Sequence, residues 1–205
     1  AVAGQVDAAF DTVVAIDNGG ASATSSPVQI TVTAPASATL TLQDGLDGYA
    51  GTRDTFLSSY HPTMNFGVAQ SLQESSPYID LVRFAIFASE GGPVPDGATI
   101  QSATLSLYKS SWYDYTYQLV RMQRDWHETQ ATWQQWRTGQ AWSAPGANGP
   151  ATDYAISPDA TVSVGWSPQW LTADVTAAVQ AMALGQPNHG WRLLGVSGNS
   201  NAKNF

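Results

Sequence analysis

Cysteine is absent from this chain of 205 residues, so neither a disulfide framework nor a thiolate metal site can form. Charged residues are also scarce, at 12% of the sequence, against roughly 25% in an average globular protein. Only 8 residues are Lys or Arg, and the net charge is −8. Because no basic stripe is available to neutralise a phosphate backbone, we exclude nucleic acid as a partner.

Long apolar runs are missing too. None approaches the roughly 18 residues that a membrane span requires, and the first residues lack the basic and apolar regions of a signal peptide. We therefore expect no membrane span, and a signal peptide that is absent or already removed. Solubility must rest on Ser, Thr, Asn, Gln and Gly, which is typical of exported proteins. We predict a secreted or cell-surface protein of bacterial origin.

The N-terminal residues have the pattern of a β-hairpin. Residues 12–16 and 28–32 alternate like strands around a turn rich in Asn and Gly. This segment resembles the last strands of bacterial immunoglobulin-like or cadherin-like repeats, and a small-residue, Pro-containing linker follows at 34–38. We expect residues 1–36 to be the end of such a repeat with its linker, and residues 37–205 to be a second domain. Neighbouring domains of a larger chain are then expected partners.

Beyond the linker, short apolar or alternating runs are separated by clusters of Gly, Pro, Asn and Asp. The runs are 50–58, 71–74, 79–88, 103–109, 115–124, 161–164 and 190–196. So many runs with turn signals between them predict a β-sandwich. Residues 171–185 differ, because their apolar side chains follow helical spacing. Asp174 is placed as an N-cap and Gly185 is placed to end this helix of about three turns.

Several phrases in a fixed order carry a family resemblance. They are Asp47-Gly48-Tyr49-Ala50, Asn65-Phe66-Gly67, Leu81-Val82-Arg83-Phe84, the run 97–107, Trp126-His127-Glu128 with Thr132-Trp133, and Asp174-Val175-Thr176 with Asn188-His189-Gly190. Together they resemble the DNRLRE-type domain, a jelly-roll family that includes carbohydrate-binding modules attached to polysaccharide lyases, alginate-binding ones among them. The resemblance implies an all-β, jelly-roll β-sandwich with one short helix, preceded by the Ig-like β-hairpin segment.

The chain departs from this family pattern in two places. Ala85 stands where the family strand continues with Asp, so any role of that acid is lost. The family's closing strand, which resembles RPKLVVTY, has no counterpart before Phe205. Two explanations stay open: the chain is a fragment, or a partner chain supplies a complementing strand, with self-assembly through an edge strand as the result.

Aromatic and Arg side chains are the candidate sugar contacts. Trp and Tyr offer a flat face to sugar C–H groups, and Trp112 and Tyr113 lie near a loop tip if the neighbouring Leu residues fill the core. A planar guanidinium matches a uronate carboxylate, and Arg83 points away from its apolar neighbours. The predicted carbohydrate-binding residues are Trp112, Tyr113, Arg83, Tyr115, Arg121 and Trp136. Core packing for the aromatic residues and ordinary salt bridges for the Arg residues are the alternatives.

Three acidic residues near the start of the second domain are candidate metal ligands. Asp44, Asp47 and Asp54 are grouped among Gly residues, and clustered carboxylates can bind Ca²⁺ through oxygen. Turn-forming Asp residues have the same pattern, so both interpretations stay open. The three His residues are far apart and form no metal-binding motif.

Catalysis is not expected. The sequence has no GxSxG motif, no Cys nucleophile and no phosphate-binding Gly loop. We predict a non-catalytic extracellular module that anchors its parent protein to a polysaccharide, with a uronate-containing polymer as one candidate. The alternative is a stalk, adhesin or fibre subunit that assembles through strand complementation and has no sugar site.

Overall fold

The computed structural model divides the chain into two units, residues 1–40 and 41–205. In the second unit and just before it, the structure describes residues 37–74, 77–198 and 203–204. In the first unit it describes strand residues 10–11, 14–16, 22–24 and 28–29. The predicted division at residue 36, and the kinship of the first unit to an immunoglobulin-like repeat, stay predictions.

The first unit contains two antiparallel strand pairs. Strand β1 (Phe10–Asp11) pairs with β4 (Val28–Gln29), and β2 (Val14–Ile16) pairs with β3 (Ser22–Thr24). Both pairs join the same two arms of the chain, so this segment forms a hairpin as expected. Its first arm at 14–16, however, pairs with residues 22–24 and not with the predicted strand at 28–32. The turn that the sequence predicts between the arms lies outside the described residues.

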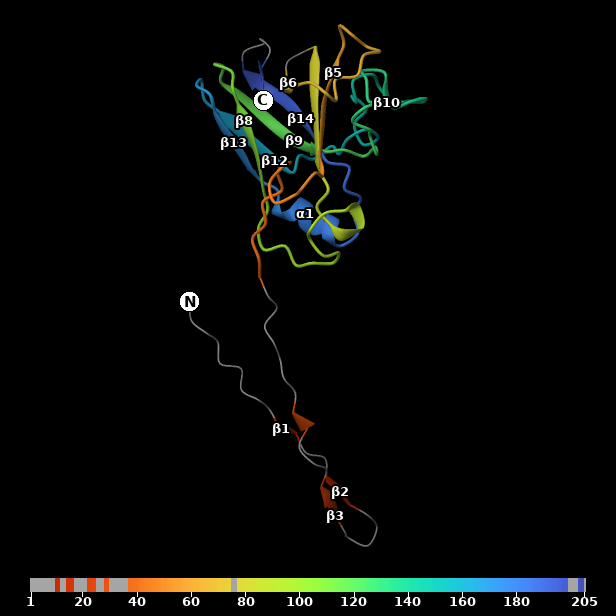
Figure 1. Ribbon diagram of the computed structural model, residues 1–205, viewed down its shortest axis with the longest axis vertical. Helices are drawn as coiled ribbons and strands as arrows, with labels where there is room; N and C mark the ends of the chain where they lie inside the picture. The colour runs from red at the N-terminus through yellow and green to blue at the C-terminus, as the bar shows by residue number, and fades with distance from the viewer. Residues whose placement is uncertain are drawn as a thin grey trace. The chain divides into compact units, whose positions relative to one another are not determined.

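The second unit is a sandwich of antiparallel strands (Figure 1). One layer is a five-stranded sheet in the order β12 (Ala160–Val164), β9 (Tyr115–Arg121), β14 (Trp191–Gly198), β7 (Tyr78–Phe84) and β5 (Thr52–Ser58). The other layer is the pair β8 (Thr104–Lys109) and β13 (Gln169–Asp174). Two short pairs flank them, β6 (Gln73–Glu74) with β15 (Lys203–Asn204) and β10 (Gln135–Arg137) with β11 (Gln140–Ala141). The all-β sandwich is confirmed.

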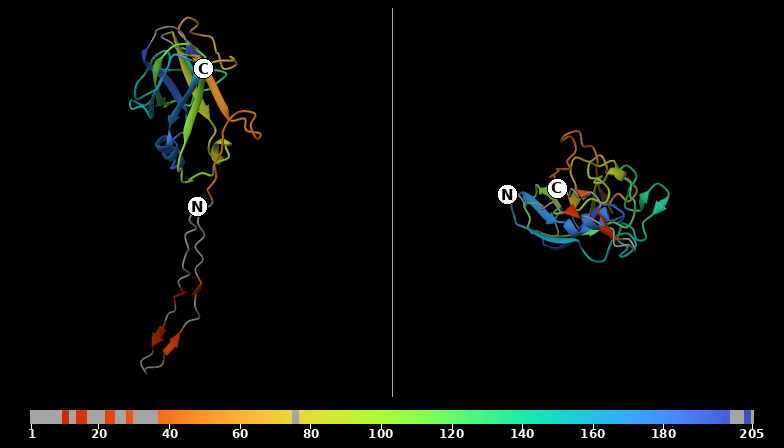
Figure 2. Two further views of the ribbon diagram at one scale, coloured as in Figure 1. Left: turned by 90° about the vertical axis from the view of Figure 1, so that its left-hand side faces the viewer. Right: turned by 90° about the horizontal axis from the view of Figure 1, so that it is seen from below.

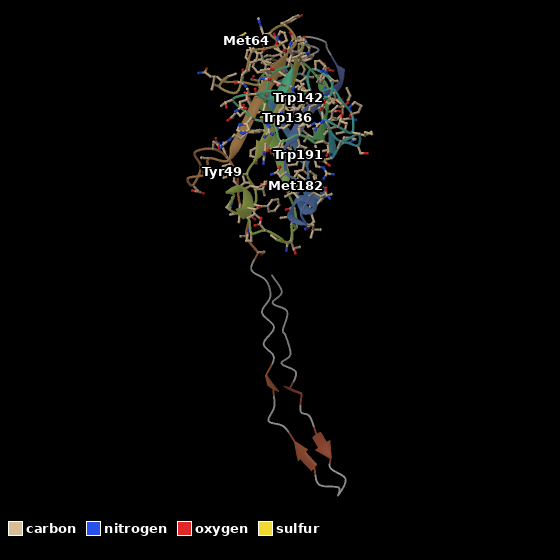
Figure 3. All side chains as sticks on the ribbon, turned by 90° about the vertical axis from the view of Figure 1, so that its right-hand side faces the viewer. Tyr49, Met64, Trp136, Trp142, Met182 and Trp191 are labelled. Carbon is tan, nitrogen blue, oxygen red and sulfur yellow. The ribbon has the colours of Figure 1, made fainter. Side chains whose placement is uncertain are left out.

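The first hydrophobic core lies between the two layers. Leu119 and Leu193 enter it from the large sheet, and Leu105 and Leu171 enter it from the β8–β13 pair. Helix α1 (Thr176–Ala183) closes one end of this core with Met182, and Figure 2 shows the 3₁₀ turn η1 (Ala88–Glu90) at the same end. In Figure 3 Met182 lies beneath Trp191, which is fully buried in the same core.

The second core covers the opposite face of the large sheet. Leu57 and Leu81 point into it from β5 and β7, and loop residues Trp126, Trp142 and Ala147 close it. Both buried indoles are satisfied, since Trp126 Nε1 donates to the His189 carbonyl at 2.8 Å and Trp142 Nε1 donates to the Thr132 carbonyl at 2.8 Å. Much of the large sheet is therefore buried on both faces. This explains why its strands contain apolar residues at successive positions.

Helix α1 is shorter than the sequence pattern predicts. Residues 171–174 belong to strand β13, in which Leu171 pairs with Leu107, and the helix begins at Thr176. Asp174 still serves the helix start, because its Oδ1 accepts the Thr176 N–H at 2.9 Å, and Gly185 with φ +100° follows its end. Within the described residues, no helix is long and apolar enough to cross a membrane.

Substitution of Gly190 tests how closely the backbone before β14 approaches β7. A Cβ at Gly190, which has φ +74°, would overlap the Val82 carbonyl oxygen, whereas Gly185 has open space around it. We expect Gly190→Ala to lower the free energy of unfolding by about 3 kcal/mol or more, because the backbone must shift. Gly185→Ala should cost only about 1 kcal/mol, the strain of a left-handed backbone. Urea unfolding followed by Trp fluorescence measures both, and equal losses would contradict the packing described.

Candidate functional site

Lys109 occupies a core-facing position at the end of β8. Leu105 and Leu107 precede it at alternating positions of the strand and pack in or against the first core. Lys109 itself is fully buried, at 0% exposure, and pairs in register with Gln169 on β13. A buried ammonium must find hydrogen-bond acceptors, because its desolvation is otherwise very costly.

The acceptors of Lys109 come from two loops that are far apart in the sequence. Its Nζ donates to the carbonyls of Ser111 at 2.9 Å and Tyr113 at 2.6 Å, in the β8–β9 loop. It also lies 2.9 Å from the Gly165 carbonyl and 3.4 Å from the Trp166 carbonyl, in the β12–β13 loop. One ammonium group therefore joins both loops. Burial lowers the pKa of Lys109, and the charge of Asp114 opposes that shift.

Three aromatic side chains project from these two loops. Trp112 is 60% exposed and Trp166 is 58% exposed, and the Tyr113 ring meets Trp166 edge to face at 5.7 Å between centroids. We call Trp112, Tyr113 and Trp166 the aromatic tip. Figure 1 shows that the two loops lie at the end of the sandwich away from α1, so the tip is free of the helix and its neighbouring turns.

A second pair of exposed aromatic residues adjoins the aromatic tip. Tyr108 and Trp170 pair directly across β8 and β13, with their rings 5.4 Å apart, and Trp170 is 62% exposed. The next outward pair along the strands is Ser106 and Thr172, and both are exposed. We call these four residues the outer strip. Flat rings and hydroxyl groups on one face can contact both the apolar faces and the hydroxyl groups of a sugar.

The structure brings together two of the six predicted sugar contacts, Trp112 and Tyr113. Tyr115 lies on β9 with its ring 4.9 Å from that of Tyr117, and it packs against the first core. Arg121 forms an ion pair with Asp159 at 3.1 Å. Both of these residues therefore already have partners inside the sandwich.

Arg83 lies on a different surface from the aromatic tip. Its Nη1 donates to Asp125 Oδ1 at 2.7 Å, and His189 Nδ1 is 3.7 Å from the same oxygen. Arg121 aligns with Trp191 and hence with Val82, so the next residue, Arg83, points to the opposite face of the sheet. One carboxylate therefore cannot be held by Arg83 and Arg121 together.

Trp136 lies in strand β10, at the second core. It is half-buried, and the Arg137 guanidinium stacks over its ring at 4.4 Å from the centroid. Trp136 belongs to the hairpin of β10 and β11, and Figure 3 shows it close to Trp142 of the second core. Trp136 is therefore separate from the aromatic tip.

Several residues of this surface were not among the predicted contacts, namely Trp166, Lys109 and all four residues of the outer strip. Trp166 follows Gly165 and precedes Ser167-Pro168, a loop sequence in which an exposed aromatic residue is a functional signal. Lys109 could have been recognised as a charged residue at an apolar position of an alternating strand. Trp170 follows in the same Ser- and Pro-containing stretch and carries the same signal.

The structure does not gather the three predicted calcium ligands into one cluster. Asp44 Oδ1 accepts the Thr52 N–H at 2.9 Å, and Asp47 lies in an exposed turn with φ +50°. Burial raises the pKa of Asp54, and the charges of Glu128 and Asp44 raise it further. Within the described ranges, no three His, Asp or Glu side chains are grouped closely enough to hold a metal ion. Calcium binding by these residues stays a prediction.

Asp54 makes the stability depend on pH. Because its pKa is raised above 3.8 in the folded state, its ionised form lowers stability as the pH rises through the folded pKa. We expect Asp54→Asn to raise the melting temperature near neutral pH in EDTA, and the gain to vanish below pH 3.8. Asp47→Asn, which removes an equal charge from an exposed turn, should change little.

Calorimetric scans of both variants across pH check this expectation, and a lower melting temperature for Asp54→Asn at neutral pH would contradict it. The same scans test calcium binding. If Asp54 is a ligand, added Ca²⁺ raises the melting temperature of the wild type and not that of Asp54→Asn.

A comparison with known families places this surface in context. The model of carbohydrate-binding module family 96 matches residues 48–205, which include both loops of the aromatic tip, the outer strip and Lys109. No curated protein matches the chain. The family match covers most of the sequence, from before β5 to the last residue. The chain therefore belongs to carbohydrate-binding module family 96.

Proposed function

We propose that this chain is a non-catalytic module that holds a larger extracellular protein on a polysaccharide, with the aromatic tip as its main contact surface. The observation that carries the proposal is the pair of exposed Trp residues on two loops that one buried Lys joins. Membership of family 96 supports a carbohydrate as the ligand, and the geometry of the aromatic tip supports this surface as the place where the carbohydrate binds.

The energetics of stacking favour this surface. An indole face buries much apolar area with few rotatable bonds, so little conformational entropy is lost when a sugar ring lies on it. The loops that present Trp112 and Trp166 are held by Lys109 before any ligand arrives. Preorganisation of this kind improves affinity, because less ordering has to accompany binding.

A uronate-containing polymer is the finer part of the proposal, and Arg83 carries it. Arg83 pairs directly with Arg53 across β5 and β7, where like charges are unfavourable, and each has an acidic neighbour, Glu128 for Arg53 and Asp125 for Arg83. The present partner of Arg83, Asp125, has a side chain that is 55% exposed. A uronate carboxylate can therefore compete with Asp125 for this guanidinium at a solvent-accessible position.

Affinity electrophoresis on alginate, pectin, xylan, cellulose and chitin tests the proposal. We expect retardation of the wild type on at least one polymer, and loss of about tenfold in affinity for Trp112→Ala and for Trp166→Ala, because each removes a stacking face. Tyr60→Ala is the matched control, since Tyr60 is also an exposed aromatic residue, 70% accessible, but lies beyond β5 at the other edge of the large sheet. It should bind like the wild type.

Each other outcome has a definite meaning. Retardation that survives both Trp substitutions would place the sugar site elsewhere. Selective loss of alginate and pectin binding in Arg83→Gln would support the uronate contact, and loss of binding in EDTA would support a calcium requirement. No retardation on any polymer would refute the proposal and favour the stalk or fibre alternative.

A further inference from the structure

We propose that Lys109 is a positioning residue for sugar binding: its ammonium group fixes the β8–β9 and β12–β13 loops relative to each other and so sets the affinity of the aromatic tip. This inference rests on the proposed function for its effect on affinity. The structural part of the inference, that Lys109 keeps the two loops ordered, does not depend on sugar binding.

The hydrophobic core does not need a charge at position 109. The preceding core-facing residues of β8, Leu105 and Leu107, are apolar, and a third apolar side chain would extend the same packing. Burying an ammonium costs free energy unless acceptors surround it. All four acceptors of Lys109 are backbone carbonyls, which belong to the two loops and not to a strand or to α1.

The acceptor positions coincide with the tip residues. The carbonyls of Tyr113 and Trp166 belong to two of the three tip residues themselves. The other two, from Ser111 and Gly165, immediately precede Trp112 and Trp166 in the chain. Each tip residue is therefore flanked by at least one peptide group whose carbonyl accepts a hydrogen bond from Lys109. Hydrogen bonds from a charged donor are shorter and stronger than neutral ones, which suits this constraint on two exposed loops.

The test compares the wild type with Lys109→Met, which keeps the length and apolar stem of the side chain and removes the ammonium. We expect the sandwich to remain folded while backbone amides of residues 110–114 and 165–167 exchange faster. Acrylamide should quench the Trp fluorescence more strongly. Affinity for the polysaccharide that retards the wild type should fall by roughly tenfold, because the aromatic tip of the variant loses conformational entropy when it becomes ordered on binding.

Arg192→Met is the matched control. Arg192 is also a buried cation, and it donates to the Ala147 carbonyl at 2.5 Å and to Asn148 Oδ1 at 2.8 Å, in a loop over the second core. Its loss should destabilise the domain to a comparable degree. Exchange in the two tip loops and polysaccharide affinity, measured well below the melting temperatures, should nevertheless stay at wild-type values.

The outcomes separate this inference from the proposed function. Unchanged exchange in the tip loops of Lys109→Met overturns the inference, whether or not the wild type binds a polysaccharide. Faster exchange with unchanged affinity overturns its effect on binding. Equal loss of affinity in Lys109→Met and Arg192→Met would show a general stability effect and overturn the specific role. Faster exchange when the wild type binds none of the polymers supports the structural role while the proposed function fails.

Discussion

Burial of the large sheet on both faces is the constraint on which the rest of this domain depends. One face packs on β8, β13 and α1, and the other is covered by loops that bring in Trp126 and Trp142. Neither face of that sheet is then available for a broad ligand surface in the region these cores cover. Binding must therefore use the outer face of β8–β13, the loops at the ends, or the sheet's margins. The burial of Trp126 and Trp142 under these loops, and the exposure of Trp112, Trp166 and Trp170, follow from this arrangement.

Buried charges hold the long loops in a chain that has no cysteine. Asp153 is fully buried, and its carboxylate accepts N–H groups of Ser143, Ala144 and Gly149 at 2.9 to 3.2 Å. Burial alone would raise the pKa of Asp153, but these hydrogen bonds outweigh it and the pKa is lowered. Lys109 has the corresponding role with a positive charge, since its ammonium group donates hydrogen bonds to backbone carbonyls of two loops. A single ionised side chain that binds several backbone groups can thus order a loop without a covalent link.

Local patterns in the sequence predicted much of the fold, and long-range pairing explains what they missed. Alternation located β5, β8 and β12 to within two residues at each end, because it reports directly which side chains face a core. It failed at 171–174, where strand and helix spacings overlap and the pairing of Leu171 with Leu107 decides the outcome. Trp112 was recognised from its place after a strand. Trp166 was not among the predicted contacts, because its place beside Tyr113 depends on the β8–β13 and β9–β12 pairings and on the contacts of Lys109, which no local pattern reports.

The scarcity of surface charge agrees with a ligand whose recognition relies on stacking and hydroxyl contacts. Lys109, Arg192, Asp80 and Asp153 are buried, so part of an already small set of charges serves the interior. The aromatic tip and outer strip carry no Lys or Arg side chain that reaches solvent, and long-range attraction of a polyanion would have little to act on there. Under the proposed function, an acidic polymer gains its charge contact instead at the β5–β7 surface, at Arg83. Under the same proposal, sugar stacking and acid recognition use separate parts of the domain. A polymer long enough to reach both would gain affinity from the second contact without any change in the first.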